Sequence, residues 1–108
     1  MQYKGSILGK NVDVKRRFTM PAKWLDENNE FCFVANAEQA TELKVYPACE
    51  WEKMIRSKST DDEKADIARR TTHVEIKSGR LLLPKGCAWE KIDLIGVLDF
   101  IIVMKSIT

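Results

Sequence analysis

The sequence lacks most of the residue combinations on which enzymes and metal sites depend. It has one histidine, His73, and three cysteines without a Cys-x-x-Cys spacing, so a tetrahedral zinc site is not expected and the thiols are predicted to be reduced and partly buried. Without a Gly-x-Ser-x-Gly turn or a glycine-rich phosphate loop, nothing indicates a nucleophile or a nucleotide site. The adjacent carboxylates Asp61 and Asp62 would point to different faces of a helix and cannot form an acid–base pair. We therefore expect a protein that is not an enzyme and has no metal or cofactor.

Long hydrophobic runs are also missing. The longest apolar stretch, near the C-terminus, is interrupted by Asp93 and Asp99, so no uncharged segment approaches the roughly 20 residues that a membrane-spanning helix needs. Residues 1–6 contain no apolar block of the kind found in secretory signals. These absences predict a cytoplasmic protein that has no membrane partner.

The composition predicts a folded protein, and its charge is unevenly distributed. A hydrophobic fraction of 44% beside a charged fraction of 31% is ordinary for a globular chain, and 108 residues suffice for one small domain or for two half-domains that share a core. Residues 1–24 contain six Lys or Arg and one Asp, whereas residues 25–64 contain five basic and ten acidic residues. This pattern favours an anionic partner for the N-terminal part of the chain.

A weak internal repeat divides the chain. Residues 14–21, Val-Lys-Arg-Arg-Phe-Thr-Met-Pro, align with residues 77–84, Lys-Ser-Gly-Arg-Leu-Leu-Leu-Pro, and in both copies an arginine precedes the proline by four positions. Each copy predicts a strand, a tight turn, a short strand and a helix that begins at the proline, because proline fixes φ near the helical value and lacks an N–H that would be unpaired there. Gly79 is predicted to mark the second turn.

The predicted fold class is α+β. Helices are expected roughly at residues 22–28 and 85–92, strands at 31–34 with 43–46 and at 94–98 with 100–104, and two short helices between residues 48 and 70. Thr60 and Glu63 have the spacing of a capping box at the start of the second connector helix. The resulting organisation is a β-β-α-β-β unit in residues 1–47, a helical connector in residues 48–70 and a second such unit in residues 71–108. Each unit would be marginal alone, so the two are expected to pack together, within the chain or between chains. Trp24, Trp51 and Trp89 are predicted to pack in the core and not to stack on bases.

Cations gather at the first predicted turn. Lys15, Arg16 and Arg17 are consecutive at the hairpin tip, with Lys10 before them and Lys23 after them. Such a tip can reach a DNA groove or a row of phosphates, where basic side chains release counterions and arginine can form two hydrogen bonds with guanine. The alternative is a solvated basic turn that protects an edge strand from aggregation. The composition of the turn leaves both interpretations open.

These motifs resemble those of a known family. Residues 13–21, Asp-Val-Lys-Arg-Arg-Phe-Thr-Met-Pro, resemble the Asp-x-Lys-Gly-Arg-x-x-x-Pro signature of the MraZ family of bacterial transcriptional repressors, which belongs to the AbrB-like swapped-hairpin superfamily. Residues 45–52 are similar to the family's Leu-Tyr-Pro-x-x-Glu-Trp-Glu segment, and residues 79–84 resemble its second Gly-Arg-x-x-x-Pro copy. Arg69 and Arg70 fall where the connector commonly ends in paired arginines. The resemblance covers nearly the whole chain in the same order.

The resemblance implies a fold, a function and a set of site residues. The implied fold is a tandem pair of AbrB-like units of the double-psi or swapped-hairpin type, and the implied assembly is a ring-shaped homo-oligomer. The implied function is repression of the division and cell-wall gene cluster through short direct repeats in double-stranded DNA, in a nucleoid-associated protein without a small-molecule substrate. The DNA-contacting positions that it implies are Asp13, Lys15, Arg17 and Arg80, to which we add the neighbouring cations Lys10, Arg16 and Lys77.

Two positions depart from the family pattern. Arg16 stands where the family usually has glycine, so either the turn places an arginine at positive φ or its geometry differs. Ile76 replaces the acidic residue of the second copy, which favours the first turn as the part that reads DNA. The connector is also shorter than in typical members, so the number of subunits is not predicted.

Two other functions stay open. An antitoxin of the same superfold usually has an unstructured tail that wraps a toxin, whereas only four residues follow the last expected strand, which disfavours that function. A structural or adaptor ring would bind protein partners and no DNA. A gel-shift with DNA from the gene's own upstream region distinguishes the adaptor from the regulator.

Overall fold

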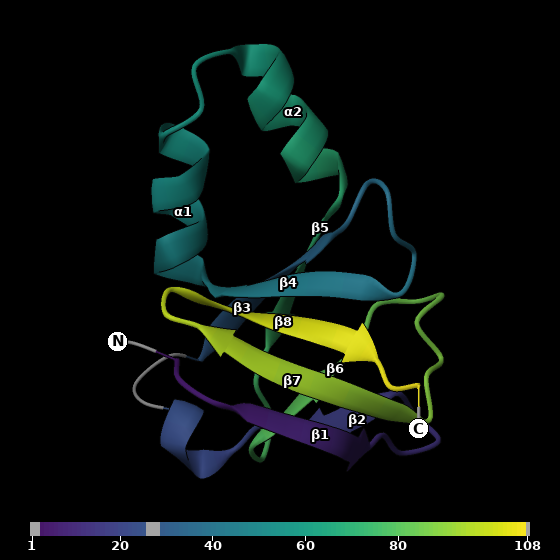
Figure 1. Ribbon diagram of the computed structural model, residues 1–108. Coiled ribbons are helices and arrows are strands. Elements are labelled where there is room, and N and C mark those ends of the chain that lie inside the picture. The colour runs from purple at the N-terminus through teal and green to yellow at the C-terminus, as the bar shows by residue number, and fades with distance from the viewer. Residues whose placement is uncertain (1–2, 26–28, 108) are drawn as a thin grey trace.

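The computed structural model describes residues 3–25 and 29–107 (Figure 1). The elements in chain order are β1 (Ser6–Asn11), β2 (Arg17–Thr19), the 3-10 turn η1 (Ala22–Trp24), β3 (Glu30–Ala35), β4 (Glu42–Pro47), α1 (Ala48–Arg56), α2 (Asp61–Arg69), β5 (Thr71–Glu75), β6 (Arg80–Leu82), β7 (Lys91–Val97) and β8 (Phe100–Lys105). The predicted α+β class is confirmed. The predicted pairs of strands after each proline are present as β3 with β4 and as β7 with β8.

Six strands form one antiparallel sheet in the order β1-β7-β8-β4-β3-β5, and β2 pairs with β6 in a separate two-stranded ribbon. Strands from the two halves of the chain pair with each other, because β1 pairs with β7, β4 with β8 and β5 with β3. Exchanging β1 with β5, β3 with β7 and β4 with β8 gives the same order read from the other edge of the sheet. The sheet thus has an approximate two-fold relation between its halves.

The register of the ribbon follows the same relation. Phe18 lies opposite Leu81, and these two residues are also equivalent in the sequence repeat. Arg17 lies opposite Leu82, and Arg80 lies opposite Thr19. The arginines of the two motifs therefore occupy equivalent places on the two strands of one short ribbon.

The core lies between the ribbon and the large sheet. Phe18 and Leu81 from the ribbon are almost fully buried, and Phe18 meets Phe33 of β3 edge to face, with ring centroids 6.5 Å apart. Removing such a side chain from water stabilises the fold by about 1.5–3 kcal/mol. Trp24 and Trp89 are buried as predicted, whereas Trp51 on α1 is half-buried. Both halves of the chain contribute side chains to this one core.

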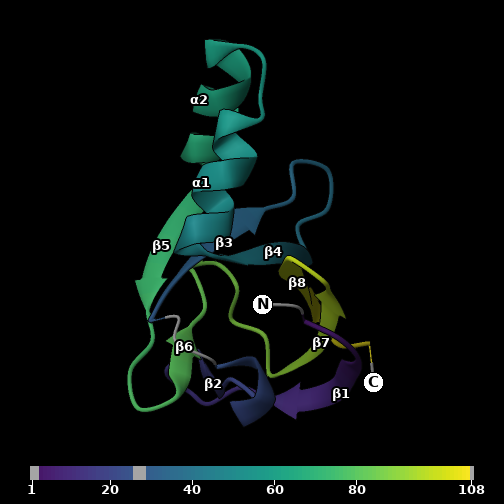
Figure 2. The ribbon, with the colours of Figure 1, turned by 90° about the vertical axis from the view of Figure 1, so that its left-hand side faces the viewer.

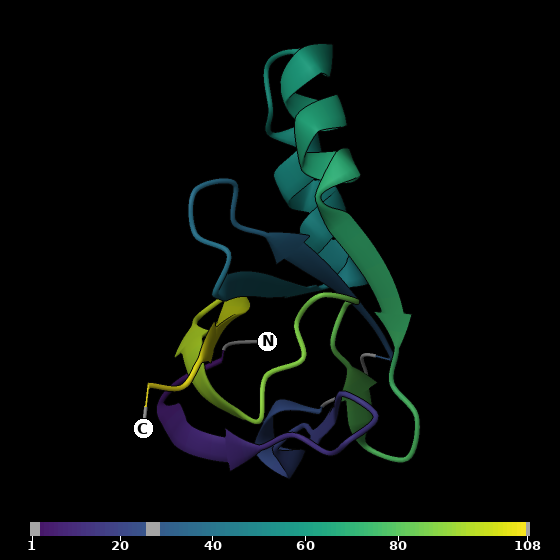
Figure 3. The ribbon, with the colours of Figure 1, turned by 90° about the vertical axis from the view of Figure 1, so that its right-hand side faces the viewer.

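The connector forms two helices that project from the end of the molecule opposite β2 and β6 (Figures 2 and 3). The predicted cap is present, because the Thr60 hydroxyl accepts a hydrogen bond of 3.1 Å from the Glu63 amide. Asp61 and Asp62 lie in the first turn of α2, where acidic side chains interact favourably with the helix dipole. In residues 3–25 and 29–107, no helix is long and apolar enough to cross a membrane.

The helix predicted for residues 85–92 is wrong. Residues 85 and 86 form a turn, residues 87–89 have no regular structure, and β7 begins at Lys91. Gly86 has a φ of +94°, which interrupts a helix, and the Cys87 amide donates to the Pro84 carbonyl at 3.1 Å. Burial of Trp89 and Ile92 in this extended path outweighs the local helical preference.

Of the helix predicted for residues 22–28, the described part contains the 3-10 turn η1. Pro21 precedes it, as expected for a proline at the start of a helical turn. Residues 26–28 lie outside the described residues, so the rest of that prediction stays a prediction.

Candidate nucleic-acid interface

The first predicted turn is a three-residue loop closed by Asp13 and Arg17. The Asp13 amide donates to the Arg17 carbonyl at 2.9 Å, and the Arg16 amide donates to the Asp13 carbonyl at 3.0 Å. Three-residue hairpin loops commonly end in a left-handed residue, and Arg16 has a φ of 65°. Of the two alternatives expected for this turn, the structure has an arginine at positive φ, at a cost of about 1–2 kcal/mol.

The Asp13 carboxylate organises this loop. Its Oδ1 accepts hydrogen bonds from the amides of Lys15 and Arg17 at 2.8 and 2.9 Å, and its Oδ2 accepts one from Arg17 Nε at 3.0 Å. The bond from the Arg17 amide is the main cause that holds the pKa of Asp13 below its ordinary value of 3.8. Asp13 is thus ionised at neutral pH and orients Arg17, whose side chain stays 40% exposed. This contact uses one of the five N–H donors of the guanidinium.

Arg16 connects the loop to Leu83, the residue that follows β6. Its Nε donates to the Leu83 carbonyl at 3.2 Å, and its own carbonyl accepts from the Leu83 amide at 2.8 Å. Arg16 is half-buried. The sequence predicted Arg16 only as a DNA contact, and the structure adds this positioning role.

The second turn is one residue shorter. Lys77 and Arg80 exchange two backbone hydrogen bonds of 3.1 and 2.9 Å across the central pair Ser78 and Gly79. Both central residues have positive φ, 53° and 73°, as a type I′ hairpin turn requires. The turn predicted from Gly79 is confirmed. Ile76 packs against the core at the position where the first turn has Asp13, so this turn has no equivalent carboxylate.

A groove of about 690 Å³ brings the cations of the two turns together. Its basic lining residues are Arg16, Arg17, Lys77, Arg80 and Lys85, and its single acidic lining residue is Glu75. Strand β5 also lines the groove, with Thr72, His73 and Val74. Five cations outnumber the carboxylates of Glu75 and of Asp13, which is paired with Arg17, and this excess of positive charge attracts an extended polyanion.

Arg17 and Arg80 also line a second hollow, of about 270 Å³, together with Asp13 and Thr19. Both arginines therefore border two adjoining depressions in the surface. Phe18 and Leu81 point into the core, and because side chains alternate along a strand, the other ribbon residues face outward. The outward side chains are those of Arg17, Thr19, Arg80 and Leu82.

The structure brings four predicted residues into the groove and places the others outside it. Lys15 is exposed at the loop tip and lines neither hollow. Lys10 lies in β1 opposite Ile92 and also lines neither. Lys85 is a groove cation that sequence reasoning missed, because it follows Pro84 in a segment that was predicted to be helical.

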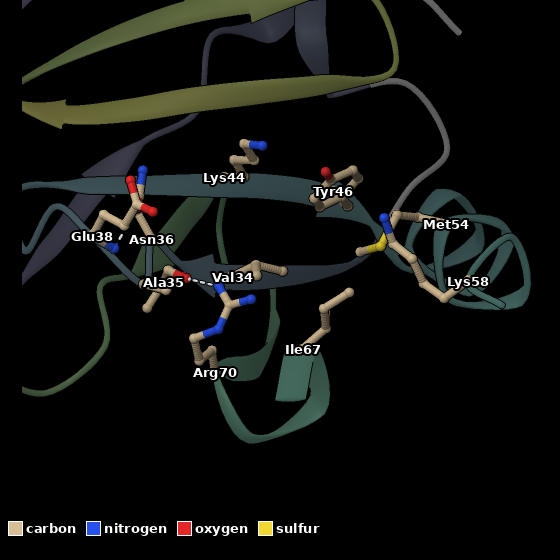
Figure 4. Close-up of a pocket in the computed structure, with 11 residues that line it drawn as sticks. Val34, Ala35, Asn36, Glu38, Lys44, Tyr46, Met54, Lys58, Ile67 and Arg70 are labelled. Carbon is tan, nitrogen blue, oxygen red and sulfur yellow. Dashed lines mark hydrogen bonds between the residues drawn. The ribbon is translucent and has the colours of Figure 1, made fainter. Parts of the chain in front are cut away.

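A separate hollow of about 310 Å³ lies between the connector and the β3–β4 hairpin (Figure 4). Arg70, at the end of α2, donates to the Ala35 carbonyl of β3 and, at 3.0 Å, to Asp66 of α2. Its Nε is buried and has no hydrogen-bond partner among the described residues. This guanidinium joins the second connector helix to the sheet, whereas the preceding Arg69 is 72% exposed and forms a long ion pair of 3.8 Å with Asp66.

The histidine and the buried cysteine lie together but do not form a reactive pair. Cys32 Sγ is 3.2 Å from His73 Nδ1, and the His73 ring meets Trp51 edge to face. Burial raises the pKa of Cys32 to about 11, so the thiol is protonated at neutral pH. All three cysteines are free. Among the residues that the structure describes, no group of three or more His, Cys, Asp or Glu could hold a metal ion.

Comparison of the chain with protein-family models found no match. A search of curated proteins also found no match.

Proposed function

We propose that this protein is a sequence-specific, double-stranded-DNA-binding transcriptional regulator, a repressor that acts as a homo-oligomer. The observation that supports this function best is the groove in which Arg16, Arg17, Lys77, Arg80 and Lys85 come together from separate parts of the chain. A groove lined by cations neutralises phosphates and releases counterions, which supplies affinity for DNA whatever its sequence.

We further propose that the chain consists of tandem AbrB-like units. The pairing of β1 with β7 and of β3 with β5 supports this proposal, because each strand that precedes a turn pairs outside its own half of the chain. The placement of Phe18 opposite its repeat equivalent Leu81 supports it too. The sequence motifs that resemble the MraZ family point the same way and suggest the division and cell-wall gene cluster as the target.

Specific recognition would come from arginines that reach base edges. Arg17 and Arg80 face outward from the ribbon, and a guanidinium can form paired hydrogen bonds with guanine O6 and N7. Asp13 already orients Arg17, so Arg17 loses less conformational freedom on binding than an unrestrained side chain does. Each protomer offers few such contacts, so several linked protomers would engage successive repeats with high avidity.

The test is the binding of a labelled duplex from the gene's own upstream region, measured by fluorescence anisotropy over a series of salt concentrations. Neutralisation of phosphates by all five groove cations corresponds to a slope of about −4.5 in a plot of log affinity against log salt for each protomer. A scrambled duplex of equal length is the control and should bind more weakly at every salt concentration.

Probe length tests the multivalent part of the proposal. A probe with several repeats should bind far more tightly than a probe with one repeat, and equal binding would exclude multivalency. Absence of any duplex binding at low salt would contradict the proposed function and favour a ring or adaptor protein that binds only proteins.

A further inference from the structure

The outward face of the β2–β6 ribbon combines charged and apolar side chains in a fixed arrangement. Arg17 and Leu82 lie directly opposite each other, and so do Thr19 and Arg80. Leu82 is 42% exposed although the adjacent Leu81 and Leu83 are fully buried. Leu82 is therefore not part of the core. Its apolar side chain is exposed next to arginines in a groove whose charged side chains are mostly cationic.

We propose that this ribbon face enters the major groove of DNA and that Leu82 contacts the 5-methyl group of a thymine beside the base read by Arg17. This inference rests on the proposed DNA-binding function and adds a residue that determines specificity. The major groove admits a two-stranded ribbon, and the thymine methyl is the one apolar group that a base pair presents there. An exposed leucine between arginines is suited to a base with an apolar edge and not to a phosphate.

The dimensions of the face agree with this placement. A strand rises by about 3.4 Å per residue, so Arg17 and Thr19 are separated by about 7 Å, which is close to two base-pair steps of about 3.4 Å. Diagonal neighbours such as Arg17 and Arg80 lie roughly 7–8 Å apart. The face therefore spans about three successive base pairs, with an arginine at either diagonal corner and Leu82 next to one of them.

The two-fold relation of the ribbon adds a constraint. Thr19 is the repeat equivalent of Leu82 and lies beside Arg80, as Leu82 lies beside Arg17. The Thr19 side chain is exposed and ends in a smaller apolar group, one methyl. Leu82 should therefore contribute more to thymine recognition than Thr19 does, which makes the two halves of the bound site unequal.

The test is a thermodynamic cycle between Leu82 and the thymine methyl. Duplexes are first selected from a random-sequence pool by the wild-type protein, and each thymine of the best duplex is then replaced in turn by deoxyuridine, which removes only the methyl group. At one position the replacement should weaken wild-type binding about fourfold for each engaged protomer, the fold-change that corresponds to the ~0.8 kcal/mol of one buried carbon group. For Leu82→Ala the same replacement should have no effect. Leu82→Met, which keeps an apolar side chain, should restore most of the dependence on the methyl.

Leu8→Ala is the matched control, because Leu8 is also an exposed leucine, at 71%, and lies in β1 outside both hollows of the interface. This variant should keep the full wild-type dependence on the methyl. Circular dichroism checks that each variant is folded.

Three results would overturn the inference, and they differ in what else they exclude. If the selected duplexes bind but deoxyuridine affects wild type and Leu82→Ala equally, or if they contain no thymine, Leu82 does not read a methyl although the protein binds DNA. If Leu82→Ala instead changes the molar mass measured by light scattering and leaves the methyl dependence intact, Leu82 belongs to a contact between copies of the chain. If no duplex is enriched or bound, the proposed function fails as well.

Discussion

Replacing each of the two outward arginines tests whether the turns are equivalent. Arg17→Ala should weaken specific DNA binding by about 1–3 kcal/mol for each engaged protomer, the range of one bidentate contact with guanine. Arg80→Ala should cost less, because no ion pair or side-chain hydrogen bond to Arg80 is present in the part of the chain that the structure describes, whereas Arg17 Nε is 3.0 Å from Asp13 Oδ2. An unrestrained long side chain loses about 0.5–1.5 kcal/mol of rotamer freedom on binding. The two variants should therefore differ in affinity by roughly two- to tenfold per protomer.

The assay is a titration of both variants against the same upstream duplex, with circular dichroism to confirm folding. Asp13→Asn removes the restraint on Arg17 and should shift the Arg17 contribution toward that of Arg80. Arg56→Ala removes one positive charge from an exposed position on α1 and should leave affinity close to wild type. If folded Arg80→Ala loses as much affinity as Arg17→Ala, the two turns contribute equally, and the orienting role assigned to Asp13 is wrong.

Three further predictions concern stability and assembly. Arg16→Gly should be about 1 kcal/mol more stable than Arg16→Ala in urea denaturation. Both variants lose the side-chain hydrogen bond to the Leu83 carbonyl, but only glycine is unstrained at positive φ. Equal stabilities of the two variants would exclude strain at this turn. Arg70→Ala should lower the free energy of unfolding by about 1–2 kcal/mol, because the hydrogen bonds to the Ala35 carbonyl and to Asp66 are lost. Arg69→Ala, which removes only a long surface ion pair, should change the free energy of unfolding by less than about 0.5 kcal/mol. Similar losses in the two variants would show that Arg70 does not join the connector to the sheet. Light scattering at micromolar concentration should find well more than a dimer, and a stable monomer would contradict the proposed homo-oligomer.

Local sequence signals predicted the elements whose formation depends on nearby residues. Thr60 and Glu63 predicted the start of α2, and Gly79 predicted the second turn, because capping and left-handed turns are decided within a few positions. The pairs β3–β4 and β7–β8 were also predicted, since their apolar residues are dense enough to indicate strands. These features did not require knowledge of the tertiary structure.

Features that depend on distant contacts could not be predicted in this way. Residues 85–92 have a helical pattern, but burial of Trp89 and Ile92 against the rest of the core selects an extended path. The groove requires β5 to lie beside the β2–β6 ribbon, and no spacing in the sequence indicates that Lys85 lines it. Exposure of Leu82 likewise depends on the register with β2, which fixes the face on which it lies.

The positions of the candidate residues were predicted more completely than their roles. Arg17 and Arg80 were chosen from the repeat, and the structure places both on one ribbon face. Arg16 was chosen for its charge, yet its Nε bonds to the Leu83 carbonyl, a contact across 67 positions that sequence reasoning cannot provide. Lys10 was chosen because it is near the turn in sequence, but its strand pairs with β7.

The central claim is that the groove and ribbon formed by the two turns bind duplex DNA. Hydrogen-exchange mass spectrometry of the full chain, with and without the upstream duplex, tests it most directly, because the method reports on each segment whatever the oligomer size. We predict slower exchange in residues 13–19 and 77–85 and unchanged exchange in the connector helices, which project from the opposite end of the molecule (Figures 2 and 3). Protection confined to the connector, or no protection in either turn at a DNA concentration that saturates binding, would contradict the claim.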